Sequence, residues 1–337
     1  MEKTTAEYKE LLMNEIEKII VGKKEQISLL IMSVFSGGHV LLDDLPGSGK
    51  TTLIKALSAA MGCSFGRIQF TPDLLPSDIL GMTVFNQKTG DFQLRKGPVF
   101  THLLLADEIN RAIPRTQSAL LEAMEERQAT IDGNSLALPS PFFVMATQNP
   151  VERESTFPLP AAQMDRFFIK MSLGYPSQEE ENQMLLRLGS SIPFHTIDSV
   201  LSPEILQEIS QEIQKVFVDD KVRDYIVKLV HATRNHSQVD TGASPRASLS
   251  LFSGSRSWAA KMCIRDSCRA SLLWREHSRK SRRAHAGSPI LLSRTRCPRR
   301  KCEGSFLAPV SLHWRGWRRP LIRCPADSNP GHAYGCS

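Results

Sequence analysis

The chain has 337 residues, a formal net charge of +7 and seven cysteines. This length allows two domains, because single hydrophobic cores stop growing at roughly 250 to 300 residues. No apolar run approaches the about 18 residues that a membrane span needs, and the charged N-terminus does not resemble a signal peptide, so we expect a cytoplasmic protein with no membrane span.

The positive charge is confined to the C-terminal quarter. Residues 1–261 contain 26 Lys and Arg against 31 Asp and Glu, whereas residues 262–337 contain 16 against 4. The balance is therefore −5 for the body and +12 for the tail. Six of the seven cysteines also follow residue 261, which leaves only Cys63 in the body. A body with this charge and cysteine content is typical of a reduced cytosolic protein and argues against a nucleic-acid partner.

The first half of the chain alternates helical and strand patterns. Helical spacing of apolar residues predicts helices over 8–20 and 27–35, and another over 50–61. Short apolar runs predict strands at 39–42, 68–70, 103–106, 142–147 and 167–171. This alternation predicts an α/β domain over 1–175, in which helices cover both faces of a parallel sheet.

After Pro176 only helices are expected. Ser177 and Glu180 have the spacing of a capping box, and Ser202-Pro203 and Ser244-Pro245 each place an N-cap before a proline at the first helical position. We interpret residues 176–261 as a small, incomplete helical lid domain.

A glycine-rich segment lies between the first strand and the helix that follows it. A phosphate-binding loop needs small residues, a helix N-terminus, a lysine for the β- and γ-phosphates and a hydroxyl for Mg²⁺. Asp44 stands where the strict pattern has its first glycine, so an incidental glycine turn is the alternative for this motif alone. The residues that we expect to bind ATP are Pro46, Gly47, Ser48, Gly49, Lys50, Thr51 and Thr52.

Two carboxylates follow the apolar strand at 103–106. We expect Asp107, together with the Thr51 hydroxyl, to hold Mg²⁺, and Glu108 to orient or deprotonate the attacking water. Adjacent acids often only mark the end of a strand. Because another strand and helix separate this pair from the glycine-rich segment, the functional interpretation is favoured.

Five further runs carry a resemblance to a known family. They include Leu-Leu-Ala-Asp-Glu-Ile-Asn-Arg at 104–111 and Leu-Pro-Ala-Ala-Gln-Met-Asp-Arg-Phe at 159–167; the others span 116–126, 146–150 and 242–246. From about residue 16 to 261 the chain resembles MoxR-type AAA+ ATPases. The resemblance implies an AAA+ P-loop NTPase fold, ATP and Mg²⁺ as cofactors, and a homo-oligomeric, hexameric ring. It also implies chaperone-like remodelling or activation of partner proteins, with a von Willebrand factor A-domain protein as companion.

The same resemblance assigns roles to single residues. It implies that Asn149 is a sensor for the attacking water, that Arg166 is an arginine finger reaching a neighbour's nucleotide, and that Arg246 is the second sensor. It further implies that Val21 and Gly22 line the adenine pocket. Without the resemblance these residues are open to plainer readings as an Asn-Pro turn, surface arginines and a glycine between two helices.

Two segments are expected to act outside hydrolysis. Alternation around Asp132-Gly133 predicts a hairpin over 127–136, which the resemblance places at the central channel of the ring. The stretch 70–81 has exposed-looking apolar residues between prolines and resembles the family's second-helix insertion. A plain surface loop is the alternative for both segments.

From Met262 onward no helical or strand period continues, and Arg outnumbers Lys fourteen to two. The run Met-Cys-Ile-Arg-Asp-Ser at 262–267 matches a translated sequencing-adapter end, so we interpret 262–337 as a non-native or disordered tail. A zinc- or RNA-binding extension is the alternative, although the tight Cys-x₂-Cys spacing of zinc sites is missing. For the whole chain, a nucleic-acid-associated AAA+ motor is the second hypothesis, and intact Lys50, Asp107 and Glu108 argue against a non-hydrolysing module.

Overall fold

The computed structural model describes residues 3–44, 47–149, 156–188 and 197–262. The prediction for Pro46 and the interpretation of the tail from residue 263 onward lie outside these described residues. No helix in the part of the chain that is described has the length and apolarity to cross a membrane.

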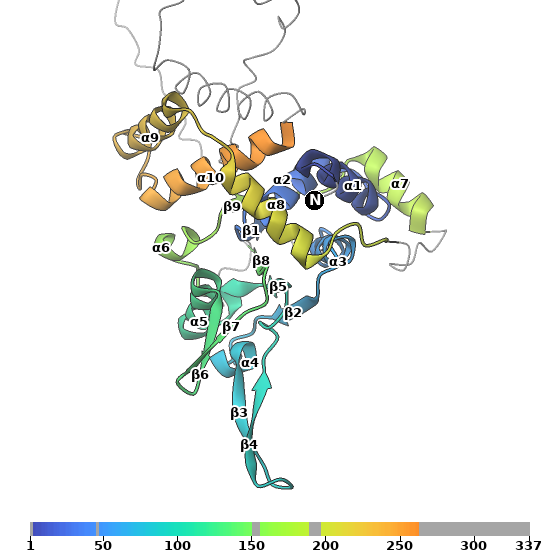
Figure 1. The fold of residues 1–337 in the computed structure, drawn as a ribbon, viewed down its shortest axis with the longest axis vertical. Helices are drawn as coiled ribbons and strands as arrows, with labels where there is room; N and C mark the ends of the chain where they lie inside the picture. The colour runs from blue at the N-terminus through green and yellow to red at the C-terminus, as the bar shows by residue number, and fades with distance from the viewer. Residues whose placement is uncertain (1–2, 45–46, 150–155, 189–196, 263–337) are drawn as a thin grey trace, which may run out of the picture. The chain divides into compact units, whose positions relative to one another are not determined.

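A five-stranded parallel sheet forms the centre of the fold (Figure 1). Its strand order is β2-β5-β8-β1-β9, so the chain passes from β1 to the edge strand β2, returns through the neighbours β5 and β8, and ends at the opposite edge with β9. The predicted parallel sheet is confirmed, with strand ends that differ from the prediction by at most three residues. The strands are β1 (Val40–Asp43), β2 (Phe65–Gln69), β5 (Leu103–Asp107), β8 (Phe143–Gln148) and β9 (Ile169–Met171).

Alternate residues of the central strands feed two separate cores. In β5, Leu103 and Leu105 join one hydrophobic cluster, whereas Leu104 and Ala106 join the other. The same alternation holds in β1 and β8. Successive side chains of a strand point to opposite faces, so a strand buried on both sides becomes a continuous apolar run. This is why these strands could be predicted from sequence.

Helices cover both faces of the sheet. Apolar residues of α1 (Thr5–Glu17), α2 (Lys24–Phe35), α3 (Lys50–Ala60) and α8 (Pro203–Lys215) share the first core. Residues of α4 (Pro76–Leu80) and α5 (Pro114–Glu126) share the second. The predicted α/β sandwich is therefore confirmed. A short α6 (Ala161–Met164) and the 3₁₀ turn η1 (Ile109–Arg111) complete this part.

In the described residues between 177 and 262 the regular elements are helices, as predicted. The three predicted helix starts begin α7 (Gln178–Leu188), α8 and α10 (Pro245–Met262), and α9 (Asp220–Arg234) lies between them. Ser177 and Glu180 exchange both hydrogen bonds of a capping box, and Ser202 and Ser244 accept bonds from the first turns of their helices. Whether residues 176–261 move as a separate lid stays a prediction.

Two hairpins extend from the second-core side. The predicted hairpin consists of β6 (Gln128–Ile131) and β7 (Asn134–Ala137), and its turn residues Asp132 and Gly133 both have positive φ. A longer hairpin, which was not predicted, consists of β3 (Gly81–Asn86) and β4 (Asp91–Lys96) and extends away from the sheet (Figure 1). The Thr83 backbone N–H donates to the Asp132 carboxylate at 3.2 Å and links the two hairpins.

The interpretation of 70–81 as carrying exposed apolar residues was partly wrong. Phe70 and Ile79 are fully buried in the second core, whereas Leu75 is 55% exposed. Pro76 begins α4, and α4 packs against α5, so apolar residues are needed on its inner side.

Candidate functional site

Three polar segments meet at the carboxyl edge of the sheet. They follow β1, β8 and β5, which are neighbours in the strand order. The backbone N–H of Asp44 donates to the Gln148 carbonyl at 3.3 Å, which brings the start of the glycine-rich loop beside the end of β8. In open α/β sheets, ligands bind outside the carboxyl ends of the strands, at the point where the strand order reverses.

The glycine-rich loop has the conformation of an anion cradle. Gly47 and Gly49 have φ of 83° and 80°, a backbone conformation that residues other than glycine rarely adopt. Gly49 is also the N-cap of α3, so the N–H groups of the first turn, at Lys50, Thr51 and Thr52, have no cap side chain in front of them. Such a helix start attracts phosphate.

Two further side chains of this loop support that fit. The Ser48 hydroxyl oxygen is buried and has no hydrogen-bond partner among the described residues, as expected where a bound group supplies one. The Lys50 ammonium donates to the Asp44 carbonyl at 3.2 Å and so lies along the loop. The described residues contain no cluster of three His, Cys, Asp or Glu side chains suited to a metal. A Mg²⁺ ion here would take one or two protein ligands and complete its shell with phosphate and water.

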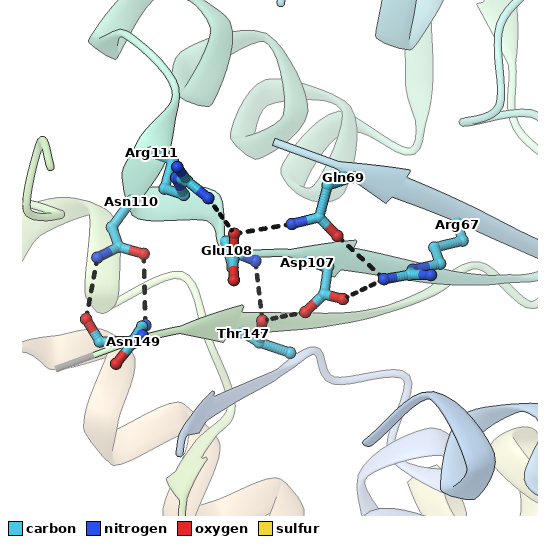
Figure 2. A network of polar contacts seen from close by, with 8 residues as sticks. All are labelled: Arg67, Gln69, Asp107, Glu108, Asn110, Arg111, Thr147 and Asn149. Carbon is cyan, nitrogen blue, oxygen red and sulfur yellow. Dashed lines mark hydrogen bonds and ion pairs between the residues drawn. The ribbon is translucent and has the colours of Figure 1, made fainter. Parts of the chain in front are cut away.

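The two acids after β5 are part of one polar network (Figure 2). Thr147, on β8, donates its hydroxyl proton to Asp107 Oδ1 at 2.7 Å and accepts from the Glu108 backbone N–H at 2.8 Å. Arg67, on β2, forms an ion pair of 2.8 Å with Asp107 Oδ2. The acid pair is therefore held from both neighbouring strands.

Glu108 is held in an unusual backbone conformation. Its φ is 55°, in the left-handed region, as the N-cap of η1. Its Oε2 accepts from Gln69 Nε2 at 2.8 Å and from Arg111 Nη1 at 3.0 Å. Two donors therefore orient the Glu108 carboxylate, and a hydrogen bond from the Glu108 backbone N–H to the Thr147 hydroxyl holds its backbone in place (Figure 2).

Asn149, at the end of β8, is buried beside this network. The amide of Asn110 donates to the Asn149 carbonyl at 3.3 Å and accepts from the Asn149 N–H at 3.4 Å (Figure 2). One side chain from η1 therefore fixes the backbone of the residue predicted to be a sensor. The acids and Asn149 are brought together, as expected.

Arg166 and Arg246 meet at a different place. Both pair with the Glu125 carboxylate at the end of α5, Arg166 with its Nε 3.1 Å from Oε2 and Arg246 with Oε1. Close by, the Ser244 hydroxyl donates to Asp165 at 2.6 Å. The two predicted arginines share one counter-charge and are fixed relative to each other.

Val21 and Gly22 lie between α1 and α2. Val21 is buried, and Gly22 has φ of 70°. A Cβ on Gly22 would come within 1.8 Å of the Glu180 carboxylate on α7. The positive φ favours glycine at this position, whereas the close contact involves the flexible end of the Glu180 side chain, which can move aside.

Arg67, Gln69 and Glu125 were missed as site residues. Arg67 and Gln69 are alternate residues of β2, so they share one face, and Gln69 is in register with Asp107. A polar pair at the carboxyl end of the edge strand β2 was the available signal. For Glu125, no local signal existed, because its partners come from α10 and the turn after α6.

Comparison with known proteins adds independent findings. The model of the ATPase family associated with various cellular activities (AAA) matches residues 39–169. The chain is 48% identical to YeaC of Bacillus subtilis over 247 residues, which cover 73% of this chain and 77% of YeaC. It is 44% identical to chaperone MoxR1 of Mycobacterium tuberculosis, with 73% and 67% covered. The crystal structure of a candidate ATPase from Cytophaga hutchinsonii is similar with a TM-score of 0.70 and 41% identity, covering 76% of this chain and 81% of that one.

Proposed function

The chain belongs to the MoxR family of AAA+ ATPases, and from this premise we propose that it binds ATP with Mg²⁺ and hydrolyses ATP to ADP and phosphate. The observation that carries the proposal is the position of Glu108. Its carboxylate is oriented by Gln69 and Arg111 on the same sheet edge that carries the glycine-rich cradle. Positioning and charge stabilisation are what phosphoryl transfer chiefly requires of a protein.

Each group has a proposed task. The backbone N–H groups of 47–52 and the Lys50 ammonium bind the phosphates. Thr51 and Asp107 hold Mg²⁺, which supplies charge neutralisation for the phosphates when bound. Glu108 orients the attacking water and accepts its proton, and Asn149 completes the placement of that water.

The remaining predicted residues act around the nucleotide. Val21 and Gly22 line the adenine side, where the backbone comes close to α7. Arg166 reaches the nucleotide of a neighbouring subunit, and Arg246 links nucleotide state to the position of α10. Both arginines pair with Glu125, so in these roles each would exchange that carboxylate for a phosphate group.

We further propose a cytoplasmic homo-oligomer, a hexameric ring that remodels or activates partner proteins. The support is the similarity to a chaperone, MoxR1. A protein with a von Willebrand factor A domain is the proposed companion, and its binding is measurable by co-purification. The acidic balance of residues 1–261 disfavours a nucleic-acid motor, so DNA added to the ATPase assay should leave turnover unchanged.

Two variants test the proposed ATPase. Lys50→Ala should abolish ATP binding, because the negatively charged phosphates of ATP lose the Lys50 ammonium that binds them. Glu108→Gln should bind ATP with parental affinity yet lower kcat at least a hundredfold, because an amide cannot accept the proton. Glu122→Gln, a change of the same kind on the exposed side of α5, serves as the control. Parental turnover in Glu108→Gln would refute the proposed role of Glu108.

A further inference from the structure

Asp44 is a buried acid at the end of β1 whose partners lie far along the chain. Its Oδ1 accepts from the Ser172 hydroxyl at 2.6 Å and from the Gly174 N–H at 3.1 Å, and its Oδ2 accepts from the Leu173 N–H at 2.7 Å. Residues 172–177 link β9 to α7 and are called the connector below. One carboxylate therefore satisfies three consecutive donors of the connector.

The same residue faces the phosphate cradle through its backbone. The Asp44 carbonyl accepts from the Lys50 ammonium at 3.2 Å. A lysine in this position moves to nucleotide phosphates when they bind, so the partner of this carbonyl changes with occupancy of the site. Asp44 is thus in contact with the cradle on its backbone side and with the connector on its side-chain side.

The segment that is proposed to line the adenine side also holds the connector. The Lys23 ammonium, next to Gly22, donates to the Tyr175 carbonyl at 2.6 Å. Gly22 itself lies against Glu180, which caps α7 with Ser177. The connector is therefore held by the start of the phosphate loop and by the segment proposed to line the adenine side.

The strict phosphate-loop pattern has glycine where this chain has Asp44. A glycine there would satisfy the loop, but it would leave the three connector donors without their acceptor. We propose that Asp44 is a positioning residue that couples the phosphate loop to the connector, so that binding of nucleotide phosphate orders the connector and the start of α7. The inference rests on the proposed ATP binding and adds a coupling residue to it.

Hydrogen–deuterium exchange of the full chain, read by mass spectrometry on peptides that cover 172–177, measures this coupling. In the parent, ATP with Mg²⁺ should slow exchange of the connector at least threefold. In Asp44→Gly, exchange without nucleotide should be faster on the order of tenfold, because the Leu173 and Gly174 N–H groups lose their charged acceptor. The response to ATP should disappear, although ATP still binds.

The variants Lys170→Ala and Asp44→Asn complete the design. Lys170 pairs with Asp43 at 2.9 Å and joins β1 to β9, so Lys170→Ala leaves the Asp44 hydrogen bonds in place and should behave like the parent. Asp44→Asn keeps the side-chain size but loses the charge and one acceptor oxygen, and it replaces the glycine variant if that one unfolds. Its connector should also exchange faster and lose the response to ATP.

The outcomes separate the inference from the proposed function. A parent that does not bind ATP refutes the proposed function and, with it, the nucleotide-dependent coupling. A parent that binds ATP while its connector does not respond overturns the inference alone. Parental connector exchange in the Asp44 variants, or an undiminished response to ATP, also overturns it.

Discussion

The side-chain amide of Gln69 donates to Oε2 of Glu108 at 2.8 Å, from the strand next to the one that Glu108 follows. This contact arises from the parallel register of β2 and β5, which pairs Gln69 with Asp107. A residue that no motif contains is therefore a direct partner of the proposed general base.

Removing this partner should affect turnover more than binding. In Gln69→Ala, the Glu108 carboxylate keeps Arg111 but loses one of its two orienting donors, and small misplacements of a catalytic group are costly. We expect kcat to fall about tenfold, with KM for ATP changed by less than about threefold. Gln93→Ala on the exposed hairpin is the matched control. A parental kcat would show that Gln69 does not orient the base.

Arg67 should compete with Mg²⁺ for Asp107, the proposed metal ligand. Its guanidinium is 2.8 Å from Oδ2 and the arginine side chain is 46% exposed, so the ion pair contributes at most about 1 kcal/mol. Arg67→Ala should therefore lower the free Mg²⁺ concentration at half-maximal activity by about two- to fivefold. A titration of ATPase activity with Mg²⁺ measures this shift, and an increased Mg²⁺ requirement would contradict it.

Arg166 should act across a subunit boundary. It is held by Glu125 at the protein surface, where a neighbour's phosphates would attract it. Arg166→Ala alone should reduce kcat at least a hundredfold, as is typical of arginine fingers. Mixing these subunits with Lys50→Ala subunits should restore activity at interfaces that combine an intact loop with an intact arginine.

The controls for this mixing experiment use other surface arginines and the mixed state itself. Arg223→Ala, in an exposed ion pair with Asp220, should keep parental activity. Native mass spectrometry verifies that mixed oligomers form. If verified mixed oligomers stay inactive, Arg166 does not act in trans.

Stability should fall in acid because of His39. Its Nδ1 accepts from the Val144 N–H at 3.0 Å, so its Nε2 donates to the Met124 carbonyl at 3.1 Å, and the ring is neutral. Burial and the nearby Arg127 guanidinium lower the pKa of His39 from 6.5 to about 3, although the hydrogen bond to the Met124 carbonyl raises it. As the pH falls, His39 becomes protonated in the unfolded chain at a higher pH than in the folded protein, and this favours unfolding. The stability that depends on neutral His39 is therefore complete above about pH 6.5 and is lost as the pH falls towards 3.

Denaturant titrations at pH 7 and pH 5 measure the effect. The free energy of unfolding of the parent should drop by about 2 kcal/mol more than that of His39→Gln, in which this position does not titrate. Equal losses in both proteins would show that His39 does not carry the acid sensitivity.

Much of the fold follows from local sequence, because strands buried on both faces are continuous apolar runs and helix starts have capping residues. The β3–β4 hairpin could not be predicted in this way, since Phe85 and Phe92 are 51% and 74% exposed and neither face has a core to impose alternation. The glycine-rich loop and the Asp107-Glu108 pair are each a continuous run of residues, so both could be predicted from the sequence. Gln69 and Glu125 became visible only when the register and helix packing brought distant segments together. The roles of Arg166 and Arg246 came from family resemblance alone and stay predictions.

The left-handed backbone of Glu108 sets activity against stability at one residue. A φ of 55° costs a side chain on the order of 1 to 2 kcal/mol, and glycine would adopt it almost freely. At this position, substitutions that relieve strain remove the carboxylate that the proposed chemistry needs. Selection for thermostability and selection for turnover therefore pull this residue in opposite directions, and engineering a more robust variant should begin elsewhere in the chain.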